Sequence, residues 1–200
     1  VSSFTITPPV TQAAQEFGSA ISLDGDVAVI GARRFDLGGV DTGVVYGFDF
    51  NSSFTAAIFV QRGDAAAQAD ALAGFAVAID RDGPTVLVGA PLTDVDSNTN
   101  QGVVLMSIGS ALETFPPLQR VFELGQGQTT ALFGRAIATD GDTLMVGAPG
   151  EAVAGALYVG AVYVYRRQSN GSYLLEARLP NPQGIAGDFF GEAVAVRGDL

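Results

Sequence analysis

Residues 133–149 read FGRAIATDGDTLMVGAP, and the same seventeen-residue pattern occurs twice more and then begins a fourth time. The other copies are FGSAISLDGDVAVIGAR from Phe17, FAVAIDRDGPTVLVGAP from Phe75 and the shortened FGEAVAVRGDL from Phe190. The starting phenylalanines lie 58, 58 and 57 residues apart. A fixed period of this length indicates a repeat architecture, in which each unit buries its apolar faces against its neighbours.

Each repeat predicts four antiparallel β-strands. Two apolar runs are separated by an Asp-Gly turn or its variant, which is the strongest short-range signal for a hairpin. The turn recurs as Asp24-Gly25-Asp26, Asp82-Gly83-Pro84, Asp140-Gly141-Asp142 and Arg197-Gly198-Asp199. Third strands are predicted at 44–48, 103–107 and 161–165, each preceded by a glycine, and a more polar fourth strand at 173–179.

Four-stranded units repeated radially make a β-propeller, so the predicted fold is all-β with about 3.5 blades in this chain. The predicted parts are an outer strand of a preceding blade in 1–16, at Phe4 to Thr7, then blades at 17–74, 75–132 and 133–189, and the start of another at 190–200. An open arc of blades leaves apolar faces and strand edges uncovered. We therefore expect the arc to belong to a larger ring, completed by other protein chains or by the remainder of a longer polypeptide.

Charge and composition narrow the possible partners. The chain has 21 acidic and 10 basic residues, a net charge of -11, and no cysteine. A negative field of this size repels phosphate backbones, so nucleic-acid binding is disfavoured. The longest apolar run, residues 152–165, is too short and too glycine-rich for a spanning helix, so we expect no membrane insertion.

The Phe-Gly start and the Gly-Ala-Pro end of the unit resemble the FG-GAP repeat of integrin α-subunit heads and of many extracellular bacterial and algal proteins. The signature positions are Phe17, Gly31, Phe75, Gly89, Phe133, Gly147 and Phe190. Two departures stand out: Ala76 replaces the first glycine in the second copy, and Arg33 replaces proline in the first. The resemblance implies that the phenylalanine packs between blades, that the glycine permits close approach of strands, and that the protein is extracellular or at the cell surface.

Integrin-type repeats often carry a calcium loop between the first two strands, whereas this chain has only a tight turn there. It therefore resembles the calcium-free variety, and we expect no cofactor. A weaker metal candidate is the loop with oxygen ligands at Asp94, Asp96, Asn98 and Asn100, which lacks the turn glycine and the closing glutamate of an EF-hand loop. A solvated polar turn is the simpler interpretation of this loop.

Three short motifs have both a structural and a functional interpretation. Asn51-Ser52-Ser53 and Asn170-Gly171-Ser172 match the N-glycosylation pattern and are also ordinary turn sequences. Arg197-Gly198-Asp199 spells the tripeptide that integrins recognise, but it stands where earlier copies have the hairpin turn.

The sequence favours a non-catalytic protein, because it lacks the histidine, cysteine and lysine side chains that most often act as bases and nucleophiles. The leading hypothesis is an extracellular structural or adhesive module of a cell-surface or filament-forming protein. The alternative is a lectin-like propeller, with sugars stacked on exposed Tyr46, Tyr158 or Tyr163 between blades. A calcium-regulated module ranks third and a hydrolase last.

Overall fold

A computed structural model describes residues 5–50, 58–60, 68–80, 85–109, 119–122 and 127–198 of the 200-residue chain. In this part of the chain every regular element is a β-strand. The strands form three four-stranded antiparallel sheets, each with its members in sequence order. The first sheet contains β1 (Phe17–Asp24), β2 (Val27–Ala32), β3 (Val44–Asp49) and β4 (Ile58–Val60). The second contains β5 (Ala76–Asp80), β6 (Thr85–Ala90), β7 (Val103–Ile108) and β8 (Gln119–Phe122). The third contains β9 (Ala136–Asp140), β10 (Thr143–Ala148), β11 (Ala161–Arg167) and β12 (Tyr173–Pro180).

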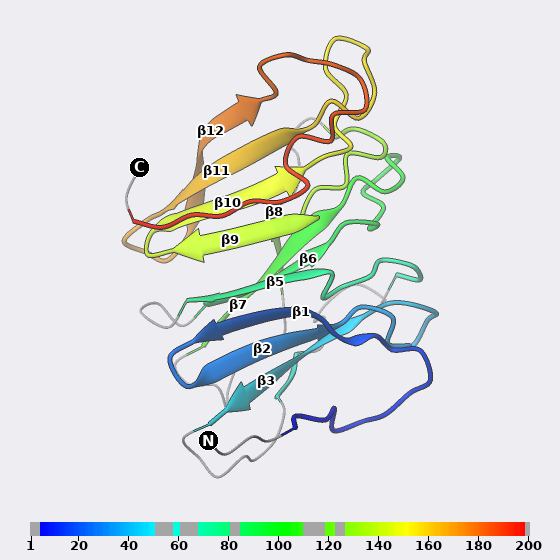
Figure 1. Cartoon of the computed structure of the whole chain (residues 1–200), viewed down its shortest axis with the longest axis vertical. Helices are drawn as coiled ribbons and strands as arrows, with labels where there is room; N and C mark the ends of the chain where they lie inside the picture. The colour runs from blue at the N-terminus through cyan, green and yellow to red at the C-terminus, as the bar shows by residue number, and fades with distance from the viewer. Residues whose placement is uncertain are drawn as a thin grey trace.

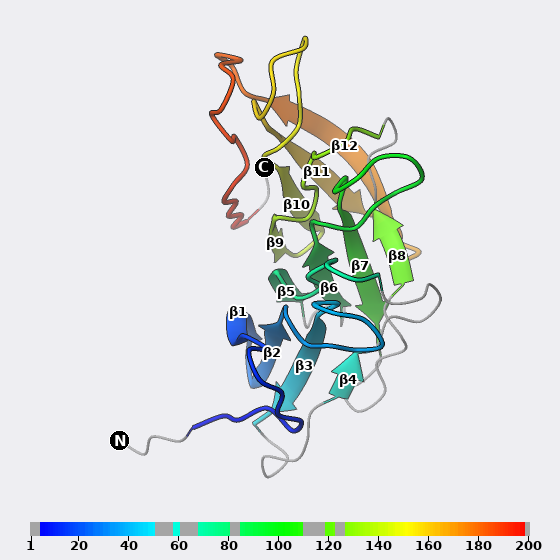
Figure 2. The same ribbon diagram turned by 90° about the vertical axis from the view of Figure 1, so that its right-hand side faces the viewer.

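The sheets are the blades of a propeller arc and are called blades 1, 2 and 3 in chain order. They follow one another along the long axis of the molecule (Figure 1). The first strands, β1, β5 and β9, lie on one side and the fourth strands, β4, β8 and β12, on the other (Figure 2). Direct contacts between β1 and β5 and between β5 and β9 join the blades along the inner side. The described residues form an open arc and not a closed ring.

Two hairpins have the predicted tight turns. Asp24 pairs with Val27 and Asp140 pairs with Thr143, which leaves two residues in each turn. Gly25 and Gly141 have φ angles of 61° and 56°, a region that glycine adopts without a steric penalty.

The second hairpin corrects the alignment of the second repeat. Asp80 pairs with Thr85, so the connection spans residues 81–84 and is two residues longer than the others. A gap-free alignment therefore displaces β5 by two positions. Because Ala76 pairs with Gly89 as Ala136 pairs with Gly147, the residue equivalent to Gly134 is Gly74, and the second copy has not lost its glycine.

The same register moves the signature aromatic residue. Ala73 takes the position of Phe133, and Phe75 takes the position of Arg135. The expectation that Phe75 begins the second unit as the inter-blade phenylalanine is therefore wrong, because the longer hairpin was not visible as an insertion in the repeat pattern.

The expected strand before Phe17 is absent from the described part of the segment. Residues 5–7 have no β partner within the described ranges, which do not include Phe4. Pro8 and Pro9, which follow at once, lack the N–H groups that a ladder requires. Ile6 instead packs against the apolar cluster of blade 1 that includes Phe35 and Tyr46.

The hydrophobic core is divided between the blade junctions. One cluster joins side chains of blade 1, such as Val29, to Val77 and Ile79 of blade 2. A second joins Leu87 and Val104 of blade 2 to side chains of blade 3. The middle strands β2 and β6 are buried throughout, as their continuous apolar sequences predict.

Candidate functional site: the blade junctions

Glycine backbones meet at each of three junctions, which we call the first (blades 1 and 2), the second (blades 2 and 3) and the third (blade 3 and the segment from Phe190). A Cβ atom on Gly31, Gly89 or Gly147 would lie 2.1, 1.9 or 2.0 Å from the carbonyl oxygen of Gly74, Gly134 or Gly191 respectively. No side chain fits at these distances, so the Gly-Ala ends of β2, β6 and β10 let the backbone of the following unit lie directly against them.

A second contact repeats at the start of each third strand. The amide of Ala73 donates to the carbonyl of Thr42 (3.0 Å), that of Phe133 to Gln101 (2.9 Å), and that of Phe190 to Val159 (3.1 Å). Each acceptor is followed by a glycine that has φ near 80° and faces the next unit. The backbone geometry of the three junctions is therefore the same, and their side chains can be compared position by position.

Phe133 fills the second junction. Its side chain is completely buried, between blade 2 residues such as Met106 and blade 3 residues such as Leu144. Its ring meets Tyr163 edge to face, with 5.5 Å between the centroids. The other two aromatic residues at this position are less buried: Phe17 is half-buried and packs on Tyr46 at the far side of blade 1, and Phe190 is 36% exposed.

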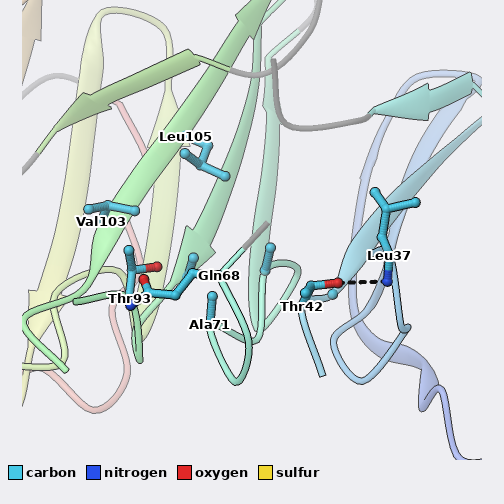
Figure 3. Close-up of a pocket in the computed structure, with 10 residues that line it drawn as sticks. Leu37, Thr42, Gln68, Ala71, Thr93, Val103 and Leu105 are labelled. Atoms are coloured by element: carbon cyan, nitrogen blue, oxygen red, sulfur yellow. Dashed lines mark hydrogen bonds between the residues drawn. The ribbon is translucent and has the colours of Figure 1, made fainter. Parts of the chain in front are cut away.

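Ala73 leaves a cavity in the first junction. The cavity measures about 20 Å³ and lies between Leu37 and Thr42 of blade 1 and a wall of blade 2 that includes Thr93 and Leu105 (Figure 3). The Thr93 hydroxyl is buried there and has no hydrogen-bond partner among the residues that the structure describes. A space of this size accommodates about one water molecule. The first junction is therefore less completely filled by protein than the second.

Phe75 lies between charged side chains of its two neighbours. The guanidinium carbons of Arg33 and Arg135 lie 4.9 and 4.3 Å from the centroid of its ring. Arg33 in turn contacts Glu16 at 2.5 Å, and Arg135 contacts Glu192 at 2.6 Å. Each cation–π contact at such a site is worth about 0.5–1 kcal/mol. This chain of contacts connects all three blades and the segment after Phe190.

A buried carboxylate joins the strands of blade 3. Glu151, 3% exposed, accepts a hydrogen bond from the Tyr163 hydroxyl (2.7 Å) and from Arg178 Nε (2.9 Å). Burial and the neighbouring Glu151 raise the pKa of Tyr163 well above its usual value. Burial alone would lower the Arg178 pKa, but the hydrogen bond and charge of Glu151 outweigh it and raise that pKa. The equivalent positions in blade 1 hold Phe35 and Tyr46, so the arrangement is a local alternative to an apolar core.

The candidate metal loop is closed by its own hydrogen bonds. Asp94 Oδ1 accepts the backbone amide of Asn100 at 2.8 Å, and Val95 and Asn98 pair across the tip. Asp96 is exposed. The residues that the structure describes contain no cluster of three or more His, Cys, Asp or Glu side chains that could hold a metal ion. Asp36 closes the corresponding loop of blade 1 in the same way, with the amide of Asp41.

Of the two glycosylation candidates, Asn51 lies outside the described residues. Asn170 is exposed in the turn between β11 and β12, where its side-chain oxygen accepts the amide of Ser172 at 3.0 Å. In the Arg-Gly-Asp motif, the Gly198 amide donates to Asp140 Oδ2, and Asp199 is outside the described part.

The tyrosines named as possible sugar platforms divide into two groups. Tyr46 is completely buried and Tyr163 is 9% exposed, so the expectation that they are available for stacking is wrong; both are needed for packing between strands. Tyr158 is 37% exposed and lies against Phe189, with 5.3 Å between ring centroids and 30° between the planes.

Sequence reasoning missed a glutamine that recurs five residues before the junction position. The side-chain oxygens of Gln12, Gln68 and Gln128 accept the backbone amides of Asp36, Asp94 and Ala152 at 2.8–2.9 Å. The recurrence was visible in the sequence, but only the corrected register places all three residues at one position. It fixes the loop after each second strand, and in the unit from Phe190 the same position is Ile185.

The described residues include no helix long and apolar enough to cross a membrane. A search of curated proteins gave no match. A family model described as FG-GAP repeat matches residues 3–48 and 125–165. These two segments contain β1, β2, β9 and β10 and most of β3 and β11, together with the junction glycines Gly31, Gly134 and Gly147. The match supports the assignment of the chain to the FG-GAP repeat family.

Proposed function

We propose that this chain is a non-catalytic structural module of an extracellular protein, and that it works by binding a further FG-GAP blade on the open face of blade 1. We define this open face by Ile21 and Leu23 of β1. They are 63% and 62% exposed.

The observation that carries this proposal is the comparison of equivalent positions. Ile21 pairs with Ile30 as Val77 pairs with Val88, so Ile21 corresponds to Val77, and Leu23 corresponds to Ile79. In blade 2 these positions are only 8% and 7% exposed, because blade 1 packs on them. The same positions are thus inter-blade core in one unit and solvent-exposed in another.

The occupant that fits is another blade of the same family. In the first and second junctions, the equivalent face of the later blade packs against the first two strands of the blade before it. An example is the contact of β5 in blade 2 with β1 in blade 1. The hydroxyl of Ser22 accepts the amide of Ile79 across that contact at 3.2 Å. A blade supplied by a second copy, by another chain or by the same polypeptide would make the same contacts.

The experiment introduces charges on the open face. The variant Ile21→Lys/Leu23→Lys should remain folded, because both side chains are already in water, and should lose association with a second blade. Light scattering of the wild-type chain should show a mass that rises with concentration, and the variant should stay at 20.5 kDa. The matched control Leu174→Lys/Leu175→Lys changes two leucines of β12 that are 60% and 54% exposed. If the control dissociates equally, the open face is not the interface.

The absence of histidine, lysine and cysteine from the sequence supports a non-catalytic role. The family resemblance and the exposed Asn170 support an extracellular location. Expression in a eukaryotic secretory host, followed by enzymatic removal of N-glycans, tests the second point. The mass shift on glycan removal should be smaller in Asn170→Gln than in the wild-type, because Asn51 is a second acceptor position. An equal shift in the two proteins would mean that Asn170 is unglycosylated and would remove this support.

Carbohydrate binding is a second candidate. The exposed pair of Tyr158 and Phe189 favours it, because flat aromatic faces stack on the C–H faces of sugar rings. Screening the chain against an array of glycans tests it, and a chain that binds none of them does not have this function.

A further inference from the structure

Thr93 is held by its backbone but not by its side chain. Its amide donates to the carbonyl of Ala90 at 3.2 Å, and its carbonyl accepts the amide of Gly102 at 2.9 Å. The residue is 1% exposed, and its hydroxyl has no hydrogen-bond partner among the residues that the structure describes. Buried hydroxyl groups are nearly always hydrogen-bonded, because an unpaired one loses its interaction with water without compensation. The Thr93 hydroxyl therefore requires a partner in the first junction.

The cavity beside Thr93 has the size and lining for that partner. It measures about 20 Å³, and a space of this size holds about one water molecule. Its polar side chains come from three segments: Thr42 of blade 1, Gln68 of the connection between the blades, and Thr93 of blade 2 (Figure 3). The other side chains that line it are those of leucine, valine and alanine. Within the described residues the lining contains no carboxylate, so its polar surface suits a neutral molecule.

Thr42 and Gln68 can complete the set of partners. The Thr42 hydroxyl accepts the amide of Leu37 at 2.8 Å and donates to a backbone carbonyl of its own loop at 3.0 Å. Gln68 Oε1 accepts the amide of Asp94 at 2.9 Å. Each of these two oxygens has a second lone pair and can accept one further hydrogen bond. Together with the Thr93 hydroxyl they give three polar groups, within the two to four that hold an internal water molecule.

The second junction fills the equivalent space with protein atoms. Glu151 is equivalent to Thr93, because the carbonyl of each accepts the amide of the glycine that precedes the third strand. The Glu151 carboxylate has two side-chain partners in its own blade, and the ring of Phe133 takes the place of the Ala73 methyl group. Both junctions lie between blades of this chain, so they can be compared directly. The first junction carries smaller residues at both positions, which explains why the cavity lies there.

We propose that the first junction contains a binding site for one internal water molecule, which the Thr93 hydroxyl anchors and which connects blade 2 to Thr42 and Gln68. The water molecule takes the place of the aromatic ring that joins blades 2 and 3. Ala73 opens the space, and Thr93 keeps it hydrated, since cavities lined only by apolar side chains stay dry. This site lies inside the arc and does not depend on the function proposed for the open face.

Magnetic relaxation dispersion of water oxygen-17 tests the site, because its amplitude counts slowly exchanging internal water molecules and does not depend on hydroxyl protons. Three variants are compared with the wild-type chain, after circular dichroism has shown that they are folded. Thr93→Val keeps the shape of the side chain and removes the hydroxyl, and Ala73→Val fills the cavity. Thr139→Val is the matched control, because the Thr139 hydroxyl donates to the carbonyl of Thr143 at 3.1 Å and does not line the cavity.

The expected result is a loss of about one internal water molecule in Thr93→Val and in Ala73→Val, with no loss in Thr139→Val. Thr93→Val should also lower the melting temperature, because the variant lacks a hydrogen bond that the wild-type chain makes. An unchanged amplitude in both cavity variants would overturn the proposal. A loss in Ala73→Val alone would overturn the role of Thr93 as the anchor. A higher melting temperature of Thr93→Val would do the same, since replacing an unpaired buried hydroxyl by a methyl group is stabilising.

Discussion

Replacing Phe133 by alanine would convert the second junction into the arrangement that the first already has at Ala73. Phe133 is completely buried, so its removal loses about 1.5–3 kcal/mol of apolar transfer free energy. It also loses the edge-to-face contact with Tyr163, worth about 1 kcal/mol. The space left behind, about 100 Å³ if nothing moves, would add up to ~2.4 kcal/mol.

The first junction shows how far such a gap can close. With alanine at the equivalent position, its remaining cavity is about 20 Å³, which corresponds to a penalty of only ~0.5 kcal/mol. Because a single substitution relaxes only partly, we expect Phe133→Ala to lower the free energy of unfolding by about 3–5 kcal/mol. Urea unfolding followed by far-ultraviolet circular dichroism measures this quantity.

Phe190→Ala is the matched control, because Phe190 occupies the same position in the third junction but is 36% exposed. Water fills the space that its ring leaves, so the loss should be about 1–2 kcal/mol from reduced burial alone. Equal losses in the two variants, or a loss below about 1 kcal/mol for Phe133→Ala, would refute the conclusion that this phenylalanine holds blades 2 and 3 together.

Three further predictions concern single residues. Gly89→Ala places a Cβ 1.9 Å from the Gly134 carbonyl oxygen, so urea unfolding should show that the free energy of unfolding falls by about 3 kcal/mol or more. The control is Gly141→Ala, whose Cβ meets nothing within 4 Å. It should lower the free energy of unfolding by only about 1–2 kcal/mol, because of the positive φ angle. Burial raises the pKa of Tyr165 above its unfolded value, so the stability linked to its neutral form is complete below about pH 10 and is lost as pH rises further. Tyr165→Phe should therefore flatten the fall in stability that begins at about pH 10, and an unchanged slope above that pH would contradict this. Removing calcium with a chelator should leave the melting temperature unchanged, because Asp94 already accepts the amide of Asn100; a fall that is abolished in Asp94→Ala would reveal a metal site.

The repeat period and the Asp-Gly turns were sufficient to predict the blades. Third strands expected at 44–48, 103–107 and 161–165 are observed at Val44–Asp49, Val103–Ile108 and Ala161–Arg167. These predictions succeed because turn chemistry and continuous apolar runs are local signals. The predicted register of β5 was wrong, because two extra residues in the hairpin shift the strand along the alignment without disturbing its apolar pattern.

The features of the candidate sites were less predictable, because they depend on which side of a junction a residue lies. The strand sequences around Tyr46 and Tyr163 do not distinguish a buried tyrosine from an exposed one. Only the packing between strands shows that both are buried. The importance of Tyr158 depends on its contact with Phe189, 31 residues further along the chain. This contact has no local sequence signal.

The central claim, that the open face of blade 1 receives another blade, is tested most directly by amide hydrogen exchange of the wild-type chain at increasing concentration. Exchange in the peptide containing β1 (Phe17–Asp24) should slow as the chain associates, while exchange in β12 (Tyr173–Pro180) should not change. Unchanged exchange in β1 at concentrations where the mass has increased, or protection confined to β12, would contradict the account.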